Sequence, residues 1–127
     1  MLMGIIVAAA LILVHELGHV LANRRLGGKF QGAVFRGLAV GVRLELPRGL
    51  RALALTSIAG PATEGILALL LLFAVAVHAL PATVVPWTLG VLALDWAVNL
   101  MPVGATDGAR LLRVWRTHRA RRAAVAS

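Results

Sequence analysis

The sequence lacks cysteine and contains few serines and few acidic residues. With no cysteine among 127 residues, disulfide bonds, cysteine nucleophiles and thiolate zinc sites are excluded. The serines, Ser57 and Ser127, do not lie in a nucleophile motif, which argues against a serine protease. The acids Asp95 and Asp107 lie close together at one end of one apolar segment. An aspartyl intramembrane protease would instead need two acids on facing helices.

Charge is also absent from a long stretch in the middle of the chain. No Asp, Glu, Lys or Arg occurs from Gly65 to Leu94, a run of 30 residues, and a membrane helix needs only about 20. Hydrophobic residues make up 60% of the chain, which is more than one soluble domain of this size can bury. The sequence therefore predicts an integral membrane protein, in which a buried acid is costly and marks a candidate functional site.

The apolar segments predict an α-helical polytopic membrane protein with about three transmembrane helices. We expect these spans at about residues 1–22, 52–80 and 84–100. Residues 1–112 then form a membrane-embedded core, and residues 113–127 form a basic C-terminal tail. A signal peptide is the alternative for the first segment, but no basic residue precedes its apolar run.

The loop between the first two spans is polar and basic. Strict alternation from Val40 to Leu46 predicts a β-strand there, and residues 30–38 are a weaker strand candidate. The chain carries 13 Lys+Arg against 5 Asp+Glu, and the basic residues gather in this loop and in the tail. By the positive-inside rule both parts are cytoplasmic and the N-terminus is outside, with the cell (plasma) membrane as the expected location. We expect the tail to contact anionic lipid, and we expect no nucleic acid partner.

A metal-binding motif lies near the end of the first apolar segment. His15 and His19 are four residues apart, so on a helix both imidazoles project from one face and can bind one Zn²⁺ ion. Glu16 is placed to act as the general base that activates water. The alternative is a pair of buried histidines bonded to the backbone or to a carboxylate.

A catalytic zinc ion usually has three protein ligands and one open position, so the two histidines need a partner. The candidates are Glu64, Asp95, Asp107, His78 and His118. Asp107 is favoured because it follows the cytoplasmic end of the third span, at the expected depth of His19. Its alternative role is an Asx turn that leads into Gly108.

Two further stretches accompany the His-Glu-x-x-His motif. NLMPVGATDG runs from Asn99 to Gly108, and IAGP runs from Ile58 to Pro61. Together these three stretches resemble the site-2 protease family of intramembrane zinc metalloproteases. NLMPVGATDG fits that family's Asn-x2-Pro-x4-Asp-Gly pattern, and IAGP, with Gly60, resembles its middle motif. The likeness extends from the first span to about Leu112, without the extra domains that many family members append.

The resemblance implies a role for each matched residue. It makes His15, His19 and Asp107 the zinc ligands and Glu16 the residue that activates water. It also implies that Asn99 lies near the substrate. Pro102 ends the third helix, so that the chain can bend and bring Asp107 to the metal.

Two acids depart from the family pattern. The middle motif usually continues Gly-Pro-x-x-Asn, but here Glu64 replaces the amide. Glu64 is a candidate for a structural ion pair or for a role at the site. Asp95 shares a helix face with Asn99 at i, i+4 spacing; it either lines the site or bonds to His78 or a hydroxyl of the second span.

The sequence therefore predicts an intramembrane zinc metalloprotease that hydrolyses peptide bonds of membrane-spanning protein substrates near the cytoplasmic side. The strand from Val40 to Leu46 is expected to hold unwound substrate by edge pairing, or to be a plain cytoplasmic hairpin. The alternative function is a non-catalytic homologue that binds metal or captures substrate. A regulatory membrane partner is a further expectation for so short a chain.

Overall fold

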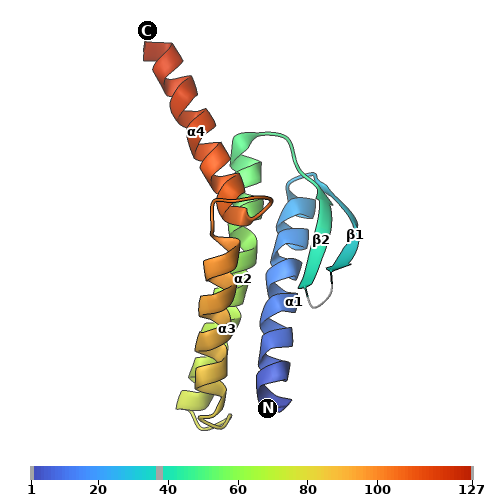
Figure 1. Ribbon diagram of the computed structural model, residues 1–127, viewed down its shortest axis with the longest axis vertical. Coiled ribbons are helices and arrows are strands. Elements are labelled where there is room, and N and C mark those ends of the chain that lie inside the picture. Colours follow the sequence, from blue (N-terminus) through green and yellow to red (C-terminus); the bar gives the residue numbers. More distant parts are fainter. Residues whose placement is uncertain (1, 37–38, 127) are drawn as a thin grey trace.

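The computed structural model describes residues 2–36 and 39–126 and is mainly helical (Figure 1). Within these residues the elements in chain order are α1 (Leu2–Arg25), β1 (Lys29–Arg36), β2 (Ala39–Glu45), α2 (Leu50–Ala76), α3 (Val84–Asn99) and α4 (Asp107–Ala126). Helices α1, α2 and α3 pack against one another, and α4 contacts α2 at its base and extends away from the bundle.

The strands β1 and β2 form one antiparallel hairpin that lies along the C-terminal half of α1 (Figure 1). The strand predicted from Val40 to Leu46 is present as β2, shifted by one residue. The weaker candidate at residues 30–38 is present as β1, and its last two positions lie outside the described residues. The register shifts between Phe30 and Gly32, where Gly32 has a φ of 135°.

Two helices, α1 and α2, are long and apolar enough to cross a membrane. The third predicted span, α3, is apolar but has only 16 residues, fewer than the about 20 that a typical crossing needs. The second predicted span was expected to continue to residue 80, but α2 ends at Ala76. The helix cannot continue because His78 has a φ of 60°, in the left-handed region.

Polar and apolar side chains are distributed in the reverse of the soluble pattern. Among the described residues the buried hydrophobic core contains Val7, Leu11, Ala68 and Val84. The buried polar residues are His15, His19, Asn23, Thr56, Ser57, Glu64, Thr88 and Asp107. Outside, large apolar side chains are exposed, among them Leu69 and Leu94 at 68% each. The bundle therefore keeps its polar groups inside and presents apolar groups to its surroundings, as expected for helices in lipid.

A close approach between α1 and α2 sets the depth of the site. A Cβ added at Gly18 would meet the Thr63 hydroxyl and the Ala59 carbonyl of α2. The Thr63 hydroxyl also donates a hydrogen bond of 3.0 Å to the Val14 carbonyl of α1. These contacts bring the histidine face of α1 against α2 at Gly60.

Candidate metal centre

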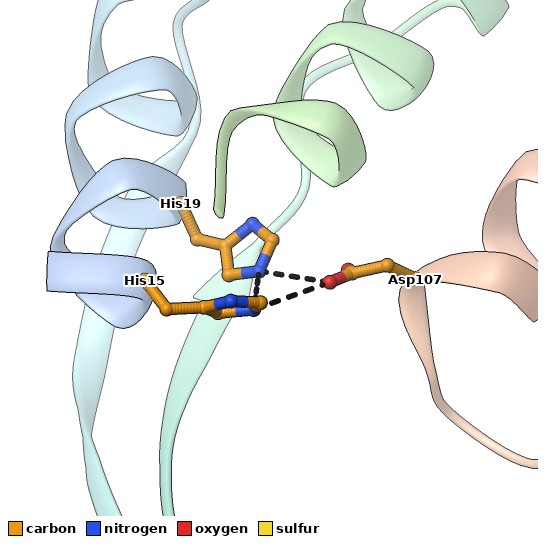
Figure 2. Close-up of side chains that lie close together, drawn as sticks. All are labelled: His15, His19 and Asp107. Carbon is orange, nitrogen blue, oxygen red and sulfur yellow. Dashed lines mark hydrogen bonds and ion pairs between the residues drawn. The ribbon is translucent and has the colours of Figure 1, made fainter. Parts of the chain in front are cut away.

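The two histidines of α1 point the same way and meet Asp107 at the start of α4 (Figure 2). The Nε2 atoms of His15 and His19 are 3.2 Å apart. The Asp107 Oδ2 atom lies 3.0 Å from the Nε2 atom of His19 and 3.5 Å from that of His15. All three side chains are at most 6% exposed.

The local sequence explains how Asp107 reaches this place. The Thr106 hydroxyl accepts a hydrogen bond from the Ala109 N–H at 3.3 Å, which caps α4, and it donates to the Val103 carbonyl at 2.9 Å. Asp107 is then the first residue of α4, where the helix dipole favours a negative charge. A Cβ added at Gly108 would overlap the Leu100 carbonyl, so glycine allows this turn to pack on the end of α3.

The outer nitrogen of each imidazole faces an acceptor, which fixes the tautomer. The Nδ1 atom of His19 lies 2.7 Å from the Thr56 carbonyl oxygen, which can only accept, so this nitrogen carries the proton. The Nδ1 atom of His15 faces carboxylate oxygens of Glu64 and Asp95, each at 3.1 Å. In the neutral imidazoles both Nε2 atoms therefore carry lone pairs.

With neutral imidazoles, three acceptor atoms of the described residues thus converge without a donor between them, which is unfavourable unless a proton or a metal ion lies there. For tetrahedral zinc with bonds of about 2.0–2.1 Å, ligand atoms should lie about 3.3–3.4 Å apart. The three observed separations, 3.0, 3.2 and 3.5 Å, bracket that value. The residues present therefore fit a zinc ion.

Gly60 provides a second, independent sign of the same site. A Cβ built on Gly60 would fall against the Nε2 atoms of both His19 and His15. The backbone of α2 can approach the metal-facing nitrogens only because this position has no side chain. Pro61 follows in the same buried turn and has no N–H to donate.

The Asp107 carboxyl is ionised at neutral pH. Burial alone would raise its pKa, but the attraction of nearby positive charge outweighs burial and lowers the pKa to about 2. The Arg110 guanidinium adds to this, since its Nη1 atom lies 3.3 Å from the Asp107 Oδ1 atom. The Oδ2 atom is left facing the histidines as an anionic ligand.

A cleft of about 400 Å³ opens beside these three residues. Glu16 lines it on the α1 side, and Val42 of β2 lines it as well. Asn99 lines the cleft from the end of α3, and residues 41–44 of β2 form the facing wall. The cleft thus places one acid and one strand edge beside the candidate metal position.

The remaining predicted positions are divided between the site and the rest of the chain. Glu64 is buried, and its Oε2 atom lies 3.1 Å from the Nδ1 atom of His15, so this acid contacts the site. Asp95 forms an ion pair with His15 at 3.1 Å and accepts a hydrogen bond of 2.8 Å from Asn99. It therefore lines the site, and its partners differ from the predicted His78 or hydroxyl. His78 and His118 are exposed and do not join the metal-binding groups of the described residues. Pro102 follows the end of α3 and is exposed.

Sequence reasoning did not single out Asn23, which holds the hairpin in place. Its Nδ2 atom donates to the Lys29 and Glu45 carbonyls at 3.3 and 3.1 Å, where β1 begins and β2 ends. Asn23 is fully buried and lies one helical turn beyond His19 on the same face. The four-residue spacing from His19 is the feature of the sequence that could have identified Asn23. Asn23 thereby fixes the hairpin to the helix that carries the histidines.

Replacing Asp107 with alanine is expected to lower zinc affinity by at least about 100-fold. Loss of an outer hydrogen-bond partner of a metal ligand costs about 10–100-fold, and loss of a ligand should cost at least as much. Competitive titration of the purified protein with a zinc chelator measures this change. Glu45→Ala, which removes an exposed acid, should keep the original affinity. Unchanged affinity in Asp107→Ala would refute Asp107 as the third ligand.

Comparison with known proteins gives a similarity to a metalloprotease. The chain is 34% identical over 125 residues to a Mycobacterium tuberculosis protein named "Putative zinc metalloprotease Rip3", in both strain Erdman and strain H37Rv. The match covers 91% of this chain but 32% of the relative, so the chain spans about a third of the length of these curated relatives. No family model matches the chain. No solved structure gives a significant match.

Proposed function

We propose that this protein is an intramembrane zinc metalloprotease that hydrolyses peptide bonds of membrane-spanning substrates near the cytoplasmic side. The observation that carries the proposal is the convergence of His15, His19 and Asp107 on one point, with Glu16 in the cleft beside them. The similarity to a protein named as a zinc metalloprotease supports the same chemistry. The ligands of the single zinc ion are then His15, His19 and Asp107.

The proposal places the cleft within or at the edge of the lipid bilayer. The exposed apolar side chains of α1 and α2, and the length of both helices, support spanning by these two elements. Helix α3, at about 24 Å, would cross most of a hydrocarbon core of about 30 Å. With the basic loop and tail inside, the N-terminus is outside the cell membrane and α4 is cytoplasmic, where its arginines would contact anionic lipid.

A bound zinc ion supplies an acidified water and a positive charge for the scissile carbonyl. Glu16 takes the proton from that water and returns it to the leaving amine as the peptide bond breaks. A helical substrate has its carbonyls paired and must unwind before attack. The edge of β2 would hold the unwound segment by main-chain hydrogen bonds, opposite Glu16, while Asn99 contacts it from α3.

Cleavage of a single-span substrate by the purified protein in lipid vesicles tests the proposal. We expect cleavage that stops when a chelator removes zinc and returns when zinc is added back. The buffer with free zinc and no protein is the blank. If zinc-loaded protein cleaves no substrate in a panel of single-span proteins, the non-catalytic alternative is correct. If cleavage continues after zinc is removed, the metalloprotease mechanism is wrong.

A further inference from the structure

The two histidine ligands differ in what holds their outer nitrogens. The Nδ1 atom of His19 faces one neutral acceptor, the Thr56 carbonyl oxygen at 2.7 Å. The Nδ1 atom of His15 faces two carboxylates, Glu64 Oε2 and Asp95 Oδ2, each at 3.1 Å. One acid comes from α2 and the other from α3. Three helices of the bundle therefore meet at a single N–H group.

Burial of Glu64 and partial burial of Asp95 are energetically unfavourable unless each carboxyl group has a partner. Glu64 is 0% exposed, and within the part of the chain that the structure describes its Oε1 atom has no hydrogen-bond partner. Asp95 is partly buried and is held by Asn99, whose amide donates to the Asp95 Oδ2 atom at 2.8 Å. A buried carboxylate is unfavourable unless a donor or a cation compensates it. For Glu64 the compensating group is the N–H of His15.

We propose that Glu64 and Asp95 are positioning residues that together orient His15 and strengthen its bond to the metal; we call this pair the acid clamp. A carboxylate that accepts from the outer nitrogen of a ligand histidine fixes the ring and makes the inner nitrogen more basic. Two carboxylates at one nitrogen extend this effect. The inference rests on the zinc site of the proposed function and does not require that the protein cleaves peptides.

The geometry predicts that the two acids substitute for each other. The His15 Nδ1 atom has two carboxylate oxygens at equal distance, of which Glu64 Oε2 forms its hydrogen bond and Asp95 Oδ2 forms an ion pair. Removal of either acid therefore leaves the other in place. Each single change should therefore cost less than half of the zinc-binding free energy that the double change costs. Non-additivity of this kind is the mark of two groups that act on one partner.

Zinc titration of the full chain in detergent micelles measures the effect. The variants are Glu64→Gln, Asp95→Asn and the two combined. Each substitution replaces a carboxylate by an amide of similar shape, so it removes the charge and leaves one oxygen as an acceptor. We expect the double variant to bind zinc about 10–100-fold more weakly, and each single variant to lose less than the square root of that factor. The matched control is Glu45→Gln, an exposed acid at the end of β2, which should bind zinc like the original protein.

A spectroscopic measurement separates positioning of His15 from a general loss of stability. In protein loaded with Co²⁺, the Nδ1 protons of the two ligand histidines give separate, strongly shifted exchangeable proton resonances. The double variant should move the His15 resonance. The His19 resonance should stay in place, because its partner is the Thr56 carbonyl. If the double variant does not fold, the two single variants decide: the His15 resonance should move in both Glu64→Gln and Asp95→Asn, and an unmoved resonance in either variant excludes that acid from the clamp.

Negative results for the acid clamp, for the zinc site and for the proteolytic function can be told apart. Zinc affinity within twofold of the original in the double variant, with both resonances unmoved, would overturn the acid clamp and leave the zinc site standing. Unchanged zinc binding in His15→Ala would overturn the zinc site and the clamp together. Zinc binding that depends on the clamp, without peptide cleavage, would overturn only the proteolytic function.

Discussion

Replacing Glu16 with glutamine is expected to reduce peptide cleavage by about 10²–10⁴-fold, the range that a general acid–base group typically contributes. The amide cannot accept the proton from water or return it to the leaving amine. Zinc content should stay at that of the original protein, because Glu16 lines the cleft but is not among the three converging ligands. The measurement is the initial rate of cleavage of a single-span substrate in vesicles, together with metal analysis of the same preparation.

The matched control for Glu16→Gln is Glu45→Gln. Both changes replace one glutamate of the same chain by its amide, but Glu45 is exposed at the end of β2 and is not among the described residues that line the cleft. The initial rate of cleavage by Glu45→Gln should equal that of the original protein. Full activity in Glu16→Gln would show that another group moves the proton. Loss of zinc in Glu16→Gln would show that this glutamate supports the metal rather than the reaction.

The parts of the fold that depend on local pattern could be predicted from the sequence. The strand period from Val40 to Leu46 predicts β2, and the apolar runs predict α1, α2 and α3 to within a few residues. Helix α4 was not predicted, because it lies in the basic tail and has no apolar run. The end of α2 was missed because it depends on the backbone of His78, which adopts a left-handed conformation that side-chain periodicity does not encode. The His15–His19 pair needs only the helical period, so its shared face was predictable.

The contacts of Glu64 and Asp95 could not be predicted in the same way. Glu64 lies 49 residues from His15 in sequence, and nothing in local spacing says which helix face it meets. The bond depends on how closely α1 approaches α2, which Gly18 and Thr63 determine. Asp95 reaches the same nitrogen from a third helix. The sequence marked both acids as unusual because they are buried, but only the crossing of three helices shows that they share a partner.

Replacing Gly60 with alanine is expected to abolish stoichiometric zinc binding. The added methyl group would lie against the Nε2 atoms of His19 and His15, in the space that a bound ion shares with its ligands. To relieve the overlap, α2 must move away from α1 or the imidazoles must rotate, and either change separates the ligand atoms from Asp107. Metal analysis by mass spectrometry of purified protein, after equilibration with one equivalent of zinc, measures the loss.

The matched control is Gly90→Ala, the same substitution in a neighbouring helix. Among the described residues, a Cβ at Gly90 would meet no atom within 4 Å, so this variant should bind one zinc ion. It should also gain about 0.5–1 kcal/mol of helix stability. Circular dichroism should show that both variants keep their helices, so that lost zinc in Gly60→Ala reflects the site and not the fold. One equivalent of zinc bound by folded Gly60→Ala at unchanged affinity would contradict the site, because a side chain at that position and an ion held by both Nε2 atoms cannot occupy the same space.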